Sequence, residues 1–206
     1  MILLPLMLAA ADAPAKTPVE AERAFAADAK TIGQWTAFRK WSTDDAVMFV
    51  PQPTNAHDFL KDRKDPRQAI DWWPTASYIS CDGKLAVNTG GWKRADGSVG
   101  YFSTVWQRQP DGSWKWIVDG GDTLAVSRPR PKTPLVRTAR CLAHGDSVDA
   151  VTGNSSLDTR YGASPDASLF WLWAVTSDGA RKFGAAIYDG RTMVMVIDDQ
   201  IAAPTK

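Results

Sequence analysis

The chain has 206 residues, enough for one well-packed domain and an appendage, and its 44% hydrophobic and 23% charged residues are typical of a globular protein. A formal net charge of +1 argues against a basic nucleic-acid-binding surface and against an acidic, disordered chain. Tryptophan is the outlier, with ten copies. Because indole rings are large and their N–H groups need partners, we expect several of them at a pocket wall or domain seam, unless they fill a small core.

The N-terminal segment, residues 1–15, is predicted to be a signal-like sequence. It contains a short apolar run, residues 2–11, followed by small residues in Ala-x-Ala order, which is typical of a secretory signal and its cleavage site. The run is shorter than the roughly 20 residues that cross a bilayer, and no positive charge precedes it. We expect a periplasmic or secreted protein, with no membrane contact after signal removal; a cytoplasmic protein with an apolar N-terminal tail is the alternative.

A first helix is predicted for residues 17–30. Thr17 suits the N-cap, Pro18 suits the first helical position, and Glu20 stands three residues after the cap. The apolar stripe of this helix consists of Val19, Ala21, Ala24 and Phe25. Glu22, Arg23 and Asp28 fall outside this stripe.

Three shorter elements follow. A second helix is predicted for residues 34–41, where aromatic residues are spaced by three. Residues 44–51 predict a short strand that ends at Pro51. After a loop, residues 66–73 suit a short helix with Pro66 at its first position.

From residue 77 onward the sequence predicts an antiparallel meander of four strands. Asp-Gly pairs at 82–83, 96–97 and 111–112 are each flanked by strand-like runs, and this dipeptide favours tight hairpin turns. The meander therefore ends near residue 119.

Both faces of this meander carry apolar side chains. In the last strand Trp114, Trp116 and Val118 share one face, and Asp119 lies on the other. Because neither face is fully polar, we expect both to be covered. One face takes the helices, and the other takes either the C-terminal segment or a partner chain.

The remainder of the chain is predicted to be a linker, residues 128–134, and a C-terminal β extension, residues 135–206. Three prolines and three basic residues without periodicity indicate the linker. Strand-like residues follow it, and a loop is expected over 152–168. Three strands joined by Asp-Gly turns come last. Such a sheet must bury one face, so we expect it to pack on the main domain, with Trp171 and Trp173 near the seam.

The order of N-terminal helices and bent meander resembles the nuclear-transport-factor-2-like superfamily, a cone-shaped α+β fold shared with SnoaL-like and ketosteroid-isomerase-like proteins. The likeness is carried by "AERAFAADAKTIGQWTAF" (21–38), "DDAVMFVP" (44–51) and "GYFSTVWQRQPDGSWKWIVDGGD" (100–122). It covers about residues 17–127. The resemblance implies an α+β domain with a cone-shaped, curved antiparallel sheet behind N-terminal helices, to which the sequence adds a C-terminal three-stranded β extension.

The resemblance also implies a pocket enclosed by the curled sheet and the helices, and homodimer formation through the open sheet face. The aromatic residues proposed to line this pocket and to bind a small apolar ligand are Trp35, Trp73, Tyr101, Trp106, Trp114 and Trp116. Plain core packing of the same rings is the alternative. The superfamily includes enzymes, binding proteins and dimeric scaffolds, so the resemblance alone does not select a function.

A ketosteroid-isomerase-like enzyme needs a carboxylate base and an oxyanion donor in an apolar pocket. The catalytic candidates are Asp119, at the end of a strand, and His57, in the loop after the first strand. A turn role for Asp119 and a solvated loop position for His57 are the alternatives. The first helix has no tyrosine that could donate to an oxyanion, and Phe25 stands in that region.

The cysteines and histidines do not form a metal-binding pattern. The chain has two of each, Cys81, Cys141, His57 and His144, and no CxxC pair. No metal site and no cofactor are therefore expected. The two thiols either pair in an oxidising compartment, tying the main domain to the tail, or are two buried small hydrophobes.

Three functions stay open from the sequence. The first is an exported SnoaL-like domain that binds a small apolar molecule in an aromatic-lined pocket. The second is a cofactor-independent isomerase, hydrolase or dehydratase, and the third is a dimeric interaction scaffold without a ligand. Nucleic acid is not expected as a partner. A polar group directed into a roomy apolar pocket is the feature that favours the enzyme.

Overall fold

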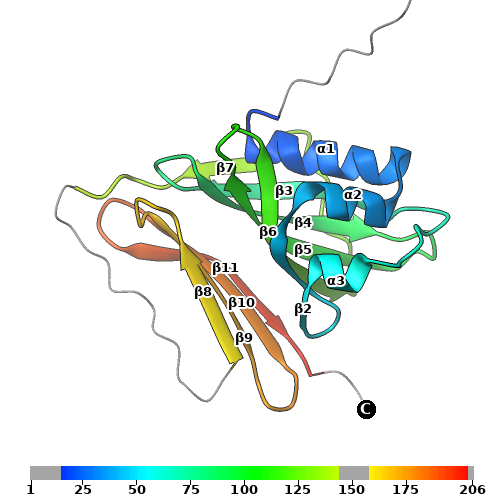
Figure 1. Ribbon diagram of the computed structural model, residues 1–206. Coiled ribbons are helices and arrows are strands. Elements are labelled where there is room, and N and C mark those ends of the chain that lie inside the picture. Colours follow the sequence, from blue (N-terminus) through cyan, green and yellow to red (C-terminus); the bar gives the residue numbers. More distant parts are fainter. Residues whose placement is uncertain (1–14, 144–157, 204–206) are drawn as a thin grey trace, which may run out of the picture.

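The computed structural model describes residues 15–143 and 158–203, and within them the chain forms three helices and two β-sheets (Figure 1). The predicted signal-like segment lies outside the described residues apart from Ala15. N-terminal helices beside a large curved sheet confirm the predicted α+β class. Of the helices in the described ranges, none is long and apolar enough to cross a membrane.

Two helices form where the sequence predicts them. Helix α1 (Pro18–Thr31) starts with a capping box: the Thr17 hydroxyl accepts a hydrogen bond from the Glu20 backbone N–H, and the Glu20 carboxylate accepts one from the Thr17 N–H. These bonds satisfy two backbone donors that the first turn would otherwise leave unpaired. Helix α2 (Gln34–Trp41) follows after Gly33.

Two other helix assignments differ from the structure. Helix α3 (Ala56–Leu60) occupies part of the loop expected after the first strand, and Asn55 caps it. The helix predicted over residues 66–73 does not form, because strand β3 (Asp71–Ile79) begins there and Trp72 pairs with Trp92 of the neighbouring strand. Aromatic residues favour strands when a partner strand is present, and that partner is distant in the sequence.

The main sheet has seven strands in the order β2-β1-β6-β5-β4-β3-β7. They are β1 (Ser42–Phe49), β2 (Pro53–Asn55), β3, β4 (Leu85–Lys93), β5 (Val99–Arg108), β6 (Trp114–Leu124) and β7 (Leu135–Thr138). Strands β3 to β6 form the predicted antiparallel meander. The sheet as a whole is mixed, since β1 runs parallel to β6 and β7 runs parallel to β3. Turn signals report only how consecutive strands pair, so they do not reveal these two contacts.

The tail forms a separate four-stranded antiparallel sheet, the tail sheet, in the order β11-β10-β9-β8. Its strands are β8 (Asp158–Ala163), β9 (Leu169–Val175), β10 (Arg181–Tyr188) and β11 (Met193–Ile201). The last three correspond to the predicted meander, but the extension has a fourth strand where a loop was expected. Strand β8 has no apolar alternation in its sequence, and its pairing with β9, for example Tyr161 with Leu172, defines it.

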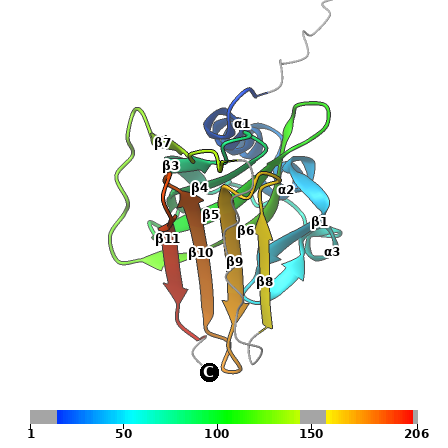
Figure 2. The same cartoon turned by 90° about the vertical axis from the view of Figure 1, so that its left-hand side faces the viewer.

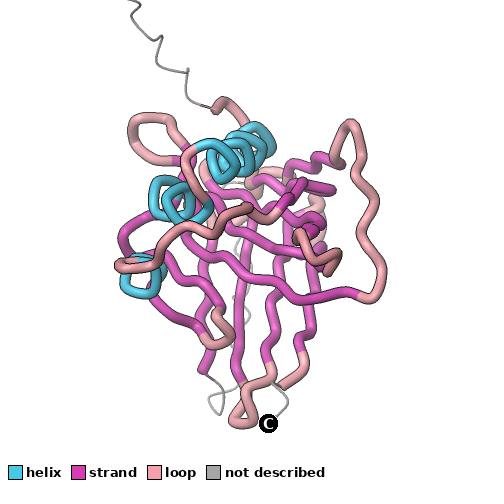
Figure 3. The backbone as a smooth tube through the Cα atoms, turned by 90° about the vertical axis from the view of Figure 1, so that its right-hand side faces the viewer, coloured by secondary structure: helices cyan, strands magenta, loops and turns pink. Residues whose placement is uncertain are grey.

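Different parts of the chain cover the two faces of the main sheet. Figures 1 and 3 show the helices gathered on one side of the strands, and Figure 2 shows the tail sheet lying along the other side. The contact between the two sheets buries Leu85, Val87, Val105, Val118, Leu169, Trp173, Phe183 and Ile187. The second face is therefore covered by the chain's own tail, and a homodimer through that face would have to displace it.

The turn between β3 and β4 is fastened to the tail by covalent and hydrogen bonds. A disulfide joins Cys81, after β3, to Cys141, after β7. The Cys81 N–H donates to the Ser168 hydroxyl (2.8 Å), and the Asp82 N–H donates to the Asp166 carboxylate (2.7 Å). These contacts hold the tail sheet at one end of the main sheet.

The predicted linker, residues 128–134, also lies against the main sheet. The guanidinium of Arg130 stacks 4.0 Å from the Trp73 ring centre. The Trp73 indole N–H in turn donates to the Pro129 carbonyl (2.9 Å). The linker is therefore packed along the sheet in the described structure.

Truncation of Trp173 tests the contact between the sheets. This side chain is 2% exposed and packs edge-on against Phe49. We expect Trp173→Ala to lower the free energy of unfolding by about 3–5 kcal/mol in urea denaturation, because it leaves a cavity in a buried core. Tyr161→Ala is the control, since Tyr161 is 58% exposed on the same sheet, and a loss under about 1 kcal/mol is expected. Equal losses would contradict the assignment of the buried face.

Candidate functional site

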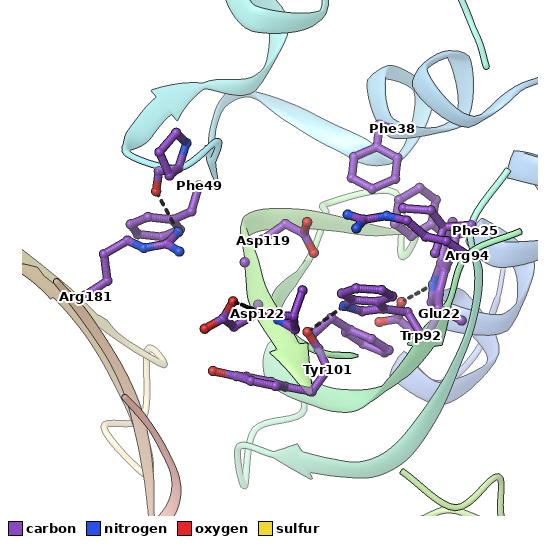
Figure 4. A pocket seen from close by; sticks show the side chains of 17 residues that line it. Glu22, Phe25, Phe38, Phe49, Trp92, Arg94, Tyr101, Asp119, Asp122 and Arg181 are labelled. Carbon is purple, nitrogen blue, oxygen red and sulfur yellow. Dashed lines mark hydrogen bonds between the residues drawn. The ribbon is translucent and has the colours of Figure 1, made fainter. Parts of the chain in front are cut away.

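A cavity of about 320 Å³ lies between the helices and the main sheet (Figure 4). Its apolar wall includes Phe25, Phe38, Trp72, Trp92 and Phe102. The pairing of β3 with β4 is irregular between Pro74 and Ala76, and the pairing of β5 with β6 is irregular between Val105 and Trp106. Such bulges bend a strand and increase its twist. The bent sheet leaves space between itself and α1 and α2.

Glu22 of α1 is one of two carboxyl groups at this cavity. It is 1% exposed, and its oxygens accept hydrogen bonds from the indole N–H groups of Trp72 (2.9 Å) and Trp106 (2.8 Å) and from the Asn88 amide (3.2 Å). Burial raises the pKa of Glu22 from 4.5 to about 7, although these hydrogen bonds act to lower it. The negative charge of Asp119 adds to the rise.

Asp119 of β6 is the second carboxyl group at the cavity. Its Oδ1 accepts a hydrogen bond from the Thr104 hydroxyl (2.6 Å), directly opposite on β5. Its Oδ2 has no hydrogen-bond partner among the described residues, and the side chain is half-buried. Burial raises the pKa of Asp119 from 3.8 to about 6, against the lowering effect of the Thr104 bond. One carboxyl oxygen is therefore free to contact a molecule in the cavity.

A bulge decides that Asp119 faces the cavity. Trp106 pairs with Trp116 and Val105 pairs with Val118, which leaves one extra residue, Ile117, on β6. Since side chains alternate along a strand, the extra residue reverses the alternation beyond it. Trp116 and Asp119 therefore lie on the helix side, while Val118 faces the tail sheet. The expectation that Trp116 and Val118 share a face was wrong for this reason.

Two arginines and an aspartate complete the cavity. Arg94, in the turn after β4, stacks 4.4 Å from the Trp92 ring centre, and Arg181 comes from the tail sheet. Asp122 of β6 lines the same cavity. Figure 4 shows the guanidinium groups of Arg94 and Arg181 on opposite sides of Asp119 in that view. The site thus combines an aromatic wall with charged groups of both signs.

The residues proposed from the sequence occupy different places. Tyr101 and Asp119 line the cavity, and the other candidates do not. Trp106, Trp114 and Trp116 are core residues, and Trp35 packs edge-on against Phe38. Trp73 lies under the linker. His57 sits on α3, where its Nε2 is 2.8 Å from the Ser42 hydroxyl, away from the cavity.

Glu22 falls outside the apolar stripe predicted for α1, yet it is buried. The buried positions of α1 include Pro18, Glu22, Phe25 and Ala29, which follow one another at intervals of four, three and four residues. A stripe drawn with this spacing includes Glu22, so the sequence did contain a signal for a carboxylate among the buried positions of the helix. Arg94 and Arg181 left no such signal, because a turn and a strand far along the chain bring them to the cavity.

Metal binding finds no support in the described part of the chain, where no group of three or more His, Cys, Asp or Glu side chains is placed to hold an ion. His144 lies outside the described residues.

The chain is similar to several solved structures. No protein-family model matches it, and no curated protein matches it. A protein from Parabacteroides distasonis named as a ketosteroid isomerase is 17% identical, with a TM-score of 0.42, over 53% of this chain and 90% of the other. A protein from Novosphingobium aromaticivorans named as an aromatic ring hydroxylase is 17% identical, with a TM-score of 0.38, over 53% and 87%.

A nuclear transport factor 2 (NTF2-like) superfamily protein from Salmonella enterica serovar Typhimurium is 15% identical, with a TM-score of 0.39, over 52% of this chain and 89% of the other. These three structures are thus named as a ketosteroid isomerase, an aromatic ring hydroxylase and an NTF2-like superfamily protein. At these identities and TM-scores no residue role is carried across, and the site is argued from its own geometry.

The buried carboxyl groups predict a pH-dependent stability. Because the folded state raises the pKa of Glu22 from 4.5 to about 7, it holds this proton more tightly than the unfolded chain. The stabilisation is complete below pH 4.5 and is lost as the pH rises to about 7, which amounts to about 3 kcal/mol. Urea denaturation at several pH values measures it, and Asp119 acts in the same direction.

Glu22→Gln should flatten this dependence, leaving only the contribution of Asp119. Glu20→Gln is the matched control, because Glu20 is an exposed residue of the same helix and caps its N-terminus. The control is expected to lower stability without changing the pH dependence. An unchanged pH dependence in Glu22→Gln would show that Glu22 is not the group responsible.

Proposed function

We propose that this domain binds a small, largely apolar molecule in the cavity and that Asp119 exchanges a proton with it, without a cofactor. The observation that supports this most is the free carboxyl oxygen of Asp119 at an otherwise mainly aromatic wall. A cavity without a polar group would favour binding alone, and a closed core would favour a scaffold. Neither describes this site.

The size and lining of the cavity support the ligand class. A volume of about 320 Å³ is at the lower end of the roughly 300–1,000 Å³ typical of ligand pockets. Apolar surface buried against Phe25, Trp72 and Phe102 contributes about 25 cal/mol per Å². A ligand with one or two rings and few polar groups fits both properties.

Asp119 suits proton exchange better than Glu22 does. Three hydrogen bonds occupy the Glu22 carboxylate, and it is 1% exposed. Asp119 offers a free oxygen, and its pKa of about 6 lies near neutral pH, where a general base is most effective. Arg94, with its guanidinium at the same cavity, is the donor proposed to stabilise negative charge on a substrate oxygen.

We also propose that the protein is exported to the periplasm or secreted. The signal-like sequence of residues 1–15 supports this location. The disulfide between Cys81 and Cys141 also supports it, because disulfides persist in oxidising compartments.

Ligand binding is tested with a panel of steroids, polyketides, fatty acids and small ring compounds, followed by tryptophan fluorescence and thermal shift. Ile70→Trp places a larger side chain at the cavity wall, and at least about tenfold weaker binding is expected because the cavity shrinks. Val126→Trp is the control, since Val126 is 78% exposed and does not line the cavity. If no panel member binds, or if both variants bind as the wild type does, the cavity is not a ligand site.

Proton exchange is tested by NMR, following deuterium incorporation next to the carbonyl of cyclic ketones in D₂O. Asp119→Asn is expected to slow the exchange by about 10²–10⁴-fold, because the amide cannot accept the proton. Asp111→Asn, in the exposed turn between β5 and β6, is the control and should leave the rate unchanged. Equal rates in wild type and Asp119→Asn would remove the catalytic part of the proposal while leaving the binding part intact.

A further inference from the structure

The tail sheet contributes a side chain to the cavity, Arg181 at the start of β10. Its Nη1 donates a hydrogen bond to the Pro51 carbonyl (2.6 Å), and the guanidinium lies 5.6 Å from the Phe49 ring centre. Figure 4 shows the side chain extending from the tail sheet toward Phe49. Contacts with the segment between β1 and β2 therefore hold the guanidinium in place.

The other donors of this guanidinium have no acceptor. Nε is buried without a hydrogen-bond partner, and Nη2 forms no hydrogen bond with a described residue. Within the described ranges Arg181 forms no ion pair, although Asp122 acts on its charge at longer range. A buried charged donor without an acceptor is unfavourable, and native structures normally satisfy it with another group.

The free donors of Arg181 match one chemical group closely. Nη2 is free to donate a charge-assisted hydrogen bond to one carboxylate oxygen, and the buried Nε on the same edge of the guanidinium becomes a second donor only if the side chain shifts. Arg94 adds a second positive charge at the same cavity, where the carboxyl groups of Glu22, Asp119 and Asp122 oppose it. The aromatic wall lies beside these groups. A ligand with an apolar body and a carboxylate would use both parts of the site.

We infer that the ligand is a small carboxylic acid whose apolar body lies in the aromatic cavity and whose carboxylate binds Arg181. This inference rests on the proposed function, since it names the class of molecule for the same cavity. It also assigns a role to the tail sheet, which supplies the residue that selects the anion. If solvent alone satisfies the guanidinium, the site shows no preference for an acid.

The experiment compares acids with their amides, which have nearly the same shape but no charge. Naphthalene-2-carboxylate is paired with naphthalene-2-carboxamide, and benzoate and cyclohexanecarboxylate with their amides, in titrations of the full chain at pH 7.5. We expect the best-binding acid to bind at least about tenfold more tightly than its amide, because the amide loses the charge-assisted hydrogen bond to Arg181. Equal affinities in every pair would overturn the inference while leaving the proposed pocket in place.

Substitution of Arg181 completes the test. Arg181→Met should remove the preference for the acid and leave binding of the amide within about twofold, whereas Arg191→Met, at an exposed turn of the same sheet, should change neither. Equal loss of acid and amide in Arg181→Met would show that Arg181 only supports the wall, against the inference. If Arg181→Met does not fold, Arg181→Lys replaces it. Lysine keeps the positive charge but lacks the planar guanidinium, so this variant should retain a reduced preference for the acid over the amide. If no acid and no amide binds while another member of the wider panel does, the inference fails and the proposed function stands; if nothing binds, the proposed function fails as well.

Discussion

The burial of Glu22 is the interaction on which the rest of the structure depends. A carboxylate taken out of water is unfavourable by several kcal/mol unless other groups donate hydrogen bonds to it. Here three donors do so, Trp72 from β3, Asn88 from β4 and Trp106 from β5. One side chain of α1 is thereby attached to three neighbouring strands. These bonds set the position of the helix over the sheet, and with it the space beside the helix.

The same network links the architecture to the chemistry. Trp72 donates to Glu22 and also forms part of the cavity wall. Asp119 borders the cavity from β6, close enough for its charge to raise the pKa of Glu22. Burial brings both carboxyl groups to pKa values near neutrality. Two such groups in a mainly apolar space are the arrangement in which protein carboxyls act as acids and bases.

The tail sheet covers one face of the main sheet and also contributes a side chain to the cavity. It packs its apolar side chains, including Trp173 and Ile187, against the face opposite the helices. That face is then unavailable to a second copy of the chain unless the tail moves away. At the same time Arg181 reaches from the tail sheet to the cavity. The extension is therefore part of the site as well as a cover for the sheet.

Much of the architecture could be predicted because its signals are local. The Thr17 cap, the Asp-Gly turns and the order of the meander strands depend on neighbours in the sequence, and they appear in the structure as expected. Predictions that depend on distant partners were less successful. Residues 66–73 were predicted to be helical, but in the structure Trp72 pairs with a residue of β4 and belongs to a strand. Strand β8 has no strand signal in its own sequence and is defined by its pairing with β9.

By itself the sequence determined the α+β class, the order of the main elements and the high tryptophan content. Only the tertiary structure decided which aromatic side chains line the cavity and which fill the core, because the direction of a side chain depends on bulges such as the one at Ile117. It also decided that Glu22 is buried and that Arg181 and Asp119 line one cavity. The physical reason is that hydrogen bonding and burial act between side chains that are near in space, and folding brings these together from far apart in the chain.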